Sequence, residues 1–251
     1  MRVDEGDKIN ILGIDLHRVD YEEACKRVSD YLKLNTCRII VTPNAEIIMA
    51  ARTDKEIKTL INSSDICLPD GIGVVLASKI LGKPLSERTT GFDFMMKMLV
   101  LANEEGLSFF LLGGKPGIAE LAGNKIISMF PNVRIAGTYH GYFNKDEEHE
   151  VVNRINENRP DILLVAMGYP KQEMFMLNNK EKLKVRVAMG VGGSLDVLSG
   201  TVRRAPVFMQ KAGLEWLYRL VTQPSRFKRM SVLPIFLIKV VMERLFFKKG
   251  Y

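Results

Sequence analysis

The chain alternates short apolar runs with longer stretches of helical periodicity, and this alternation constrains its fold more than any other feature. Apolar runs of strand length occupy residues 38–42, 108–112, 133–137, 162–167 and 185–191, with a shorter one at 66–68. Helical patterns fill the intervals at residues 45–62, 92–105, 118–130, 147–158 and 172–183, and a hairpin (9–19) and a helix (21–34) come first. Strands that alternate with helices predict an α/β fold with a largely parallel sheet.

Several of these strands end in a turn that opens a helix. The turns occupy residues 42–44, 113–117, 168–171 and 192–194. In open α/β sheets, ligands bind outside the carboxyl ends of the strands. We therefore expect the four turns to share one edge of the sheet and to hold the functional residues.

The pattern changes after residue 200, where strands stop and two helical pieces follow at 207–222 and 233–247. The second piece is too short for a membrane span and is interrupted by Lys239, Glu243 and Arg244. Its apolar and basic residues suit a helix lying in a membrane interface, and the alternative is a helix packed on the body. We divide the chain into a catalytic body (1–200) and a helical, membrane-associating appendage (201–251).

The positive charge is concentrated in this appendage. Residues 201–251 hold eleven Lys and Arg against two Glu, a net charge of +9, whereas the other 200 residues hold 25 basic and 27 acidic residues, a net charge of −2. Such asymmetry indicates an anionic partner, and we expect an anionic membrane surface. A nucleic-acid-binding module is the weaker alternative, because the tail aromatics occur among aliphatic residues rather than as a stacking platform.

Three separated cysteines without a C-x-x-C spacing favour buried thiols in a reducing compartment. The N-terminal residues lack the pattern of a signal peptide, so we expect a cytoplasmic protein. An NAD-dependent oxidoreductase is disfavoured because the dinucleotide-binding fingerprint is missing. The sequence leaves the oligomeric state open, a homo-oligomer included.

Asp70 is the strongest candidate for a catalytic group. It stands between Pro69 and Gly71, directly after a short strand, where its carboxylate can accept a proton from an attacking hydroxyl. The competing interpretation is an N-cap for the helix that begins near residue 72.

Two glycine turns are candidates for phosphate binding. Gly113 and Gly114 precede a helix whose N-terminus favours a diphosphate, although a purely structural turn fits the residues equally well. Gly192 and Gly193 form a similar turn, followed by Asp196, which is either a nucleotide ligand or a helix cap.

A third group of candidates opens the helix after the apolar run at 162–167. Lys171 and Gln172 are expected to bind substrate, and Gln172 can both donate and accept hydrogen bonds. Glu173 suits the positive end of the helix dipole and has a structural interpretation.

Neither a metal nor a cofactor is expected. The chain has no Asp-x-Asp, and its three histidines lack zinc-ligand spacing. A departing nucleotide diphosphate then needs cationic or N–H groups, which Arg88 and the appendage arginines can supply.

Ten short motifs, in order from residue 42 to 226, resemble those of the WecG/TagA/CpsF glycosyltransferases, and the TagA type above all. They are Thr-Pro-Asn (42–44), Pro-Asp-Gly-Ile-Gly (69–73), Glu-Arg-Thr-Thr-Gly (87–91), Leu-Leu-Gly-Gly-Lys-Pro-Gly (111–117), Gly-Tyr-Phe (141–143), Gly-Tyr-Pro-Lys-Gln-Glu (168–173), Val-Gly-Gly (191–193), Arg-Arg-Ala-Pro (203–206), Glu-Trp-Leu-Tyr-Arg (215–219) and Pro-Ser-Arg (224–226).

The resemblance implies a Rossmann-like body and an inverting, metal-independent transfer of N-acetylmannosamine from UDP to undecaprenyl-diphosphate-linked GlcNAc, the linkage unit of wall teichoic acid. Relatives use the uronic acid or glucose as donor sugar instead. Asp70 corresponds to the presumed base. The resemblance places Thr42, Asn44, Arg88 and Gln172 in the substrate cleft, Asp196 near the nucleotide, and Arg219, Arg226 and Arg229 at the acceptor diphosphate or leaving group. It also implies a location on the inner face of the cell membrane.

Overall fold

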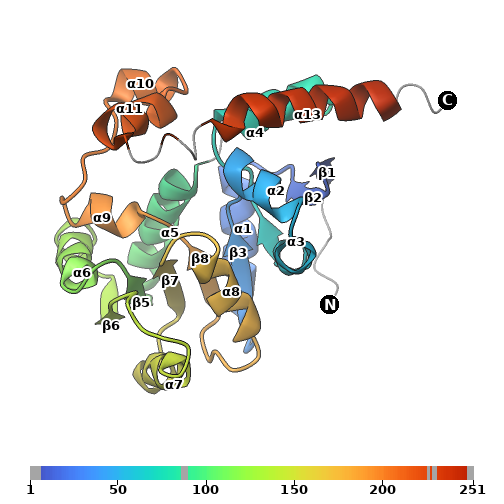
Figure 1. Ribbon diagram of the computed structural model, residues 1–251. Coiled ribbons are helices and arrows are strands. Elements are labelled where there is room, and N and C mark those ends of the chain that lie inside the picture. The colour runs from blue at the N-terminus through green and yellow to red at the C-terminus, as the bar shows by residue number, and fades with distance from the viewer. Residues whose placement is uncertain (1–6, 86–89, 225–226, 228–230, 248–251) are drawn as a thin grey trace.

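The computed structural model describes residues 7–85, 90–224, 227 and 231–247, and shows a parallel sheet with helices on both faces (Figure 1). The strands are β1 (Lys8–Ile11), β2 (Ile14–His17), β3 (Arg38–Val41), β4 (Ile66–Cys67), β5 (Ser108–Gly113), β6 (Arg134–Tyr139), β7 (Ile162–Ala166) and β8 (Val187–Gly190). The helices are α1 (Tyr21–Tyr31), α2 (Ala45–Ala51), α3 (Lys55–Asn62), α4 (Ile72–Ile80), α5 (Gly91–Glu105), α6 (Ile118–Met129), α7 (Glu148–Asn158), α8 (Lys171–Asn178), α9 (Ser194–Leu198), α10 (Val207–Lys211), α11 (Glu215–Thr222) and α13 (Val232–Phe247).

Six strands form the main sheet in the order β4-β3-β8-β7-β5-β6, and every neighbouring pair is parallel. The α/β prediction is therefore confirmed. The last strand of the sheet, β8, inserts between β3 and β7, which brings the end of the body beside its beginning. β1 and β2 form the separate antiparallel hairpin expected at residues 9–19.

Alternate side chains of each strand enter one of two apolar cores on opposite faces of the sheet. On β3, Ile39 and Val41 join the core made with α2, α3, α7 and α8, whereas Ile40 joins the core made with α1, α5, α6 and α9. The helix that follows β3 therefore covers one face, and the short helix that follows β8 covers the other. Adjacent strands with helices on opposite faces leave a crevice between their carboxyl ends, where ligands bind in such folds.

Two of the expected helices are each divided in two. The pattern at 45–62 forms α2 and α3, because the Asp54 side chain caps a new helix by accepting a hydrogen bond from the Ile57 N–H at 3.0 Å. The pattern at 207–222 forms α10 and α11, separated at Gly213, whose φ of +74° interrupts helical geometry.

The final helix, α13, packs on the body through one side. Phe236 and Val240 are fully buried against α2 and α4, the Glu243 carboxylate accepts from the Leu12 N–H at 3.3 Å, and Arg244 donates to the Ile80 carbonyl. Its outer side is apolar and exposed. The exposed residues are Ile235, Ile238, Val241, Met242, Leu245 and Phe246.

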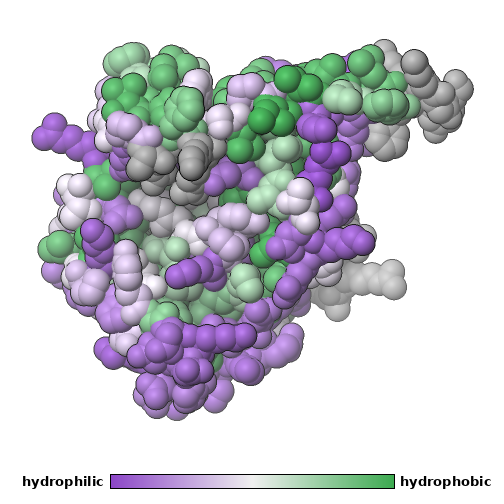
Figure 2. All heavy atoms as spheres, in the orientation of Figure 1, coloured by the Kyte–Doolittle hydropathy of each residue, from purple (hydrophilic) through white to green (hydrophobic). Residues whose placement is uncertain are grey.

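Figure 2 shows apolar side chains gathered over α10, α11 and α13, and hydrophilic side chains at the opposite end around α7 and α8. Within the described ranges, no helix has the length and apolarity needed to cross a membrane. Both interpretations of α13 from the sequence thus have a structural counterpart, since one side packs on the body and the other faces outward.

Candidate active site

A cavity of about 300 Å³ opens at the carboxyl ends of β3, β4 and β8 and is also lined by residues of α11 and α13. Its walls come from three of the four expected turns (42–44, 168–171 and 192–194), from the Asp70 turn, from the start of α5 and from the appendage. The lining residues used below are Thr42, Asn44, Asp70, Thr90, Gly91, Phe92, Tyr169, Gln172, Gly192, Gly193, Trp216 and Arg219. The crevice predicted from the strand order is therefore the place where body and appendage meet.

Asp70 lies in the wall of this cavity, between strand β4 and helix α4. Gly71, with φ +85°, holds the N-cap position of α4 and makes no side-chain cap. Asp70 is therefore not the cap, and its own N–H instead donates to the Pro43 carbonyl at 3.2 Å. This bond joins the turn after β4 to the turn after β3 and fixes the backbone that carries the carboxylate.

Thr42 and Asn44 flank Pro43 in the turn at the end of β3, beside Asp70. The Asn44 side-chain oxygen caps α2 by accepting from the Ile47 N–H at 3.1 Å, and its amide N–H groups have no partner among the residues that the structure describes. Thr42 packs against the start of α5 so closely that a Cβ on Gly91 would lie 2.8 Å from the Thr42 hydroxyl oxygen. Only glycine allows α5 to begin this near the end of β3.

Gln172 is buried in the wall, and its amide group is already engaged on both sides. Its Oε1 accepts from the Gly192 N–H at 2.9 Å, and its Nε2 donates to Glu173 Oε1 at 2.8 Å. Gly190 leaves the space for this amide, since a Cβ there would lie 2.7 Å from Nε2. Gln172 therefore holds the Gly192 turn in place, and within the described part of the chain its second amide N–H has no partner.

Tyr169 adds a neutral hydroxyl to the same wall. Burial raises its pKa to about 12, and the carboxylates of Glu173, Asp54 and Glu46 add to the effect. The phenol therefore remains protonated at physiological pH and can donate a hydrogen bond to a bound sugar or phosphate.

Two expected phosphate-binding positions lie outside this cavity. Gly113 and Gly114 are separated from β8 by β7, and a Cβ on Gly113 would lie 2.3 Å from the Ala166 carbonyl oxygen. Glycine is required there because the chain crosses the end of β7, as the 3.0 Å bond from the Gly114 N–H to the Ala166 carbonyl shows.

Lys171 and Asp196 do not line the cavity either. Lys171 is exposed at the start of α8. Asp196 lies in the first turn of α9, where Gly193 is the N-cap, so the expected helix-cap role for Asp196 is not realised. Its carboxylate lies beside Gly193, with Oδ2 3.6 Å from the position of a Cβ on that residue.

From the appendage, Arg219 and Trp216 of α11 line the cavity. Arg219 thus reaches the wall that also contains Asp70. Arg88, Arg226 and Arg229 lie outside the described residues. Within the described part of the chain, no group of three or more His, Cys, Asp or Glu side chains is arranged to hold a metal ion.

Comparison with known proteins identifies the family. The model of the Glycosyl transferase WecG/TagA/CpsF family matches residues 9–250. The chain belongs to this family. The resemblance inferred from the ordered motifs is therefore confirmed.

Three relatives of the WecG/TagA/CpsF family are each named N-acetylglucosaminyldiphosphoundecaprenol N-acetyl-beta-D-mannosaminyltransferase. The one from Bacillus spizizenii is 38% identical over 84% of this chain and 81% of its own length. The one from Bacillus subtilis is 38% identical over 90% and 85%, and one from Staphylococcus aureus is 34% identical over 97% and 96%. The similarity therefore extends over both the body and the appendage.

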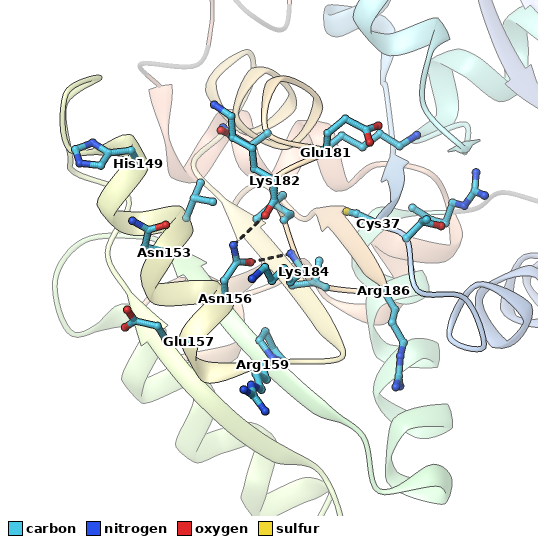
Figure 3. Close-up of a pocket in the computed structure, with 18 of the residues that line it drawn as sticks. Cys37, His149, Asn153, Asn156, Glu157, Arg159, Glu181, Lys182, Lys184 and Arg186 are labelled. Carbon is cyan, nitrogen blue, oxygen red and sulfur yellow. Dashed lines mark hydrogen bonds between the residues drawn. The ribbon is translucent and has the colours of Figure 1, made fainter.

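A larger hollow, of about 1520 Å³, lies at the opposite edge of the sheet (Figure 3). It is formed at the amino ends of β3, β7 and β8, and Asn156 of α7 bridges it by bonding to the Lys182 carbonyl and the Lys184 N–H. None of the WecG/TagA/CpsF motifs contributes to it. Because ligands in this fold bind at the carboxyl ends of the strands, the smaller cavity is the candidate active site.

The sequence interpretation assigned no role to several residues of the smaller cavity. Trp216 and Tyr169 lie inside recognised family motifs, so their motifs were the signal. Thr90 likewise lies inside a recognised motif (87–91), whereas Phe92 reaches the cavity because the start of α5 packs against Thr42, a long-range contact with no local signal.

Proposed function

We propose that this chain transfers N-acetylmannosamine from UDP-N-acetylmannosamine to undecaprenyl-diphosphate-linked GlcNAc with inversion at the sugar. The names of the three relatives state this acceptor and this sugar. The proposal rests on one observation: Asp70, Thr42 and Asn44 of the body line the same cavity as Arg219 of the appendage. A single displacement requires a base for the attacking hydroxyl and a cation for the leaving group, and this cavity is lined by one of each.

In this mechanism Asp70 accepts the proton of the acceptor hydroxyl. The hydroxyl oxygen then attacks the anomeric carbon of N-acetylmannosamine, and the bond from that carbon to the phosphate oxygen breaks. The electron pair leaves with UDP, whose added charge requires stabilisation at the moment of transfer. The base and the leaving group lie on opposite faces of the sugar, which inverts the anomeric centre.

Charge stabilisation without a metal is assigned to cationic side chains and N–H groups. Arg219 is the described cation in the cavity wall, and we assign the same role to Arg88, Arg226 and Arg229 from their motifs. Gly193 supplies a backbone N–H at the same wall, since the N–H of the preceding Gly192 already donates to Gln172. The neutral Tyr169 hydroxyl adds a donor.

The acceptor carries a long lipid, and the appendage supplies a surface for the membrane that holds it. The outer face of α13 presents large apolar side chains, and the appendage has a net charge of +9. Apolar contact with lipid and attraction to anionic headgroups together favour binding in the interfacial plane. We therefore place the protein on the inner face of the cell membrane.

The test combines purified protein, a short-chain lipid-diphosphate-GlcNAc acceptor and, separately, UDP-N-acetylmannosamine, its uronic acid and UDP-glucose, with product mass as the readout. The expected product is the N-acetylmannosaminyl disaccharide lipid. A product with only one of the other donors would reassign the sugar. The absence of any product with every donor, in the presence of membranes, would overturn the transferase assignment.

Asp70→Asn tests the base. Loss of proton acceptance should lower kcat by roughly a hundredfold or more while the Kd for UDP changes little. The matched control is Asp146→Asn, an exposed carboxylate before α7 that is far from the cavity in sequence and lines neither hollow. Unchanged turnover in Asp70→Asn would remove this residue as the base.

A further inference from the structure

The helix pair α10–α11 contributes Trp216 and Arg219 to the cavity although none of its helical residues is buried. The turn between the two helices touches the body, since Gly213 is buried against Ile72 of α4. Among the described residues, α10 and α11 therefore share no buried apolar core with the body. Polar contacts must then contribute much of what fixes α11 over the site.

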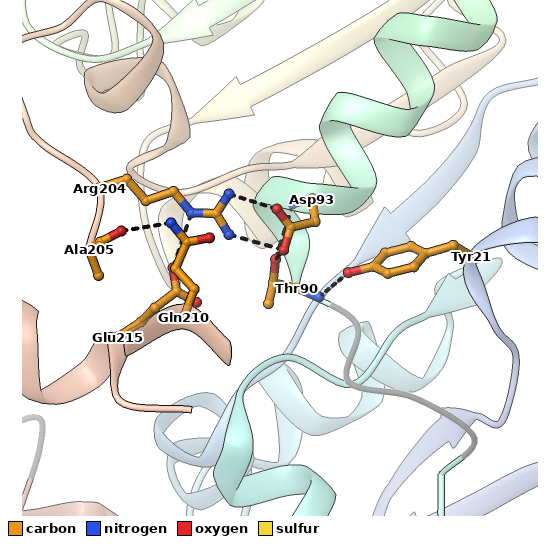
Figure 4. A network of polar contacts seen from close by, with 7 residues as sticks. All are labelled: Tyr21, Thr90, Asp93, Arg204, Ala205, Gln210 and Glu215. Carbon is orange, nitrogen blue, oxygen red and sulfur yellow. Dashed lines mark hydrogen bonds and ion pairs between the residues drawn. The ribbon is translucent and has the colours of Figure 1, made fainter. Parts of the chain in front are cut away.

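Arg204, in the segment that leads from the body to α10, makes such contacts to both sides (Figure 4). Its Nη1 and Nη2 donate to the two carboxylate oxygens of Asp93 at 2.7 and 3.0 Å, and its Nε donates to Glu215 Oε1 at 3.1 Å. The guanidinium also lies over the Phe92 ring, 4.4 Å from its centroid. Bidentate pairing of this kind fixes direction as well as distance.

The Asp93 side of this network is held rigidly by the body. Thr90 caps α5 by accepting from the Asp93 N–H at 3.1 Å, and its hydroxyl donates to Asp93 Oδ2 at 2.7 Å. The Thr90 N–H in turn donates to the Tyr21 hydroxyl at 2.9 Å. Asp93 is therefore a fixed point on the body, at the rim of the cavity that Thr90 and Phe92 line.

The Glu215 side belongs to the first turn of α11, one residue before Trp216 and four before Arg219. One guanidinium thus joins a carboxylate of the body to a carboxylate of the helix above the active site.

We propose that Arg204 is a positioning residue that holds α11 over the active site, and so sets where Trp216 and Arg219 lie. The inference rests on the proposed function for its kinetic consequence, although the placement of α11 can be measured without it. A misplacement of about 1 Å in a charge-stabilising group can lower a rate by roughly a hundredfold.

The first test uses fluorescence, because Trp216 is the only tryptophan of the chain and lies on α11. Arg204→Ala should shift its emission to longer wavelength and increase its quenching by acrylamide. Free guanidinium at millimolar concentration should reverse both changes by bridging Asp93 and Glu215, whereas sodium chloride at equal concentration should not. The control is Arg203→Ala, since Arg203 is exposed and adjacent.

The second test is a double-mutant cycle with Arg219→Ala, read as kcat and KM. If Arg204 acts by placing Arg219, Arg204→Ala alone should lower kcat by roughly tenfold to a hundredfold, and should cause much less further loss once Arg219 is already absent. Fully additive losses would contradict positioning, and so would a wild-type rate in Arg204→Ala.

Asp93→Asn is the second variant if Arg204→Ala does not fold, because it removes one charge and keeps the shape of the helix start. It should also expose Trp216 and lower kcat. An unchanged Trp216 emission in both variants would overturn the proposal. A changed emission that guanidinium reverses, in a protein with no transferase activity, would support the positioning role while rejecting the proposed function.

Discussion

At the scale of single residues, Glu173 is the most unusual group near the cavity. Its side chain is 2% exposed, Oε1 accepts from Gln172, and Oε2 is buried without a hydrogen-bond partner within the described ranges. Burial raises its pKa above the ordinary value of 4.5, although the bond from Gln172 opposes this. Glu173 therefore supports Gln172, and through it the Gly192 turn, at the expense of a poorly solvated carboxylate.

Glu173→Gln should relieve that penalty in a pH-dependent way. With a raised pKa, the folded state binds the proton more tightly, so the carboxyl contributes full stability below 4.5 and loses it as the pH rises through the raised pKa. The amide has no such dependence. The free energy of unfolding of the variant, relative to that of wild type, should therefore rise between pH 4 and pH 8, and the difference in melting temperature should rise with it.

The control for this experiment is Glu157→Gln, which changes an exposed carboxyl on α7 in the same chemical way. Its melting temperature should follow that of wild type across the pH range. A Glu173→Gln protein whose difference from wild type is constant or falls with pH would contradict the burial argument.

At the scale of elements, local patterns in the sequence located nearly every helix and strand of the body. They did not locate the points at which two of the predicted helices, one in the body and one in the appendage, are each divided in two. The division between α2 and α3 depends on the Asp54 cap, and that between α10 and α11 depends on Gly213. Aspartate and glycine also occur inside continuous helices, so neither residue type by itself marks a break. Apolar periodicity continues across such a break, so periodicity alone joins the two helices. Which side of α13 packs on the body could be determined only from three-dimensional contacts, because apolar residues surround the whole helix.

Replacing a phenylalanine by alanine should have different effects on the two sides of α13. Phe236→Ala removes a fully buried ring and should lower the free energy of unfolding by about 3 kcal/mol. Phe246→Ala removes an exposed ring, so it should leave stability unchanged and weaken binding to lipid vesicles. Denaturant unfolding and vesicle sedimentation measure the two effects. Equal loss of stability in both variants would show that the outer side of α13 is also packed against protein.

At the scale of the whole molecule, the active site depends on which strands become neighbours. Four turns were expected at one edge of the sheet, and parallel pairing does place them there. Only the order of the strands decides which turns share a cavity, and β8 pairs with β3 across almost 150 residues of chain. That pairing brings Gly192 to Thr42 and leaves Gly113 beyond β7. Local sequence cannot supply this, because it depends on the packing of both cores.

The distribution of charge across the molecule gives a last prediction. Under the proposed membrane binding, we expect an anionic bilayer to repel the body, with net charge −2, and to attract the appendage, with net charge +9, and so to orient the cavity toward the lipid. Binding to vesicles with anionic lipid should weaken by roughly tenfold or more as salt rises from low to physiological concentration, because screening shortens the reach of these charges.

Vesicles of neutral lipid provide the comparison. They should bind the protein weakly and with little dependence on salt, since only the apolar face of α13 then contributes. Equal, salt-independent binding to both vesicle types would show that the apolar face of α13 anchors the protein and that the positive charge of the appendage does not contribute.

A truncation to residues 1–200 should lose both kinds of binding and all transfer, and it should be less stable because α13 no longer covers α2 and α4. Full transfer by the truncation on a soluble acceptor would reduce the appendage to an anchor.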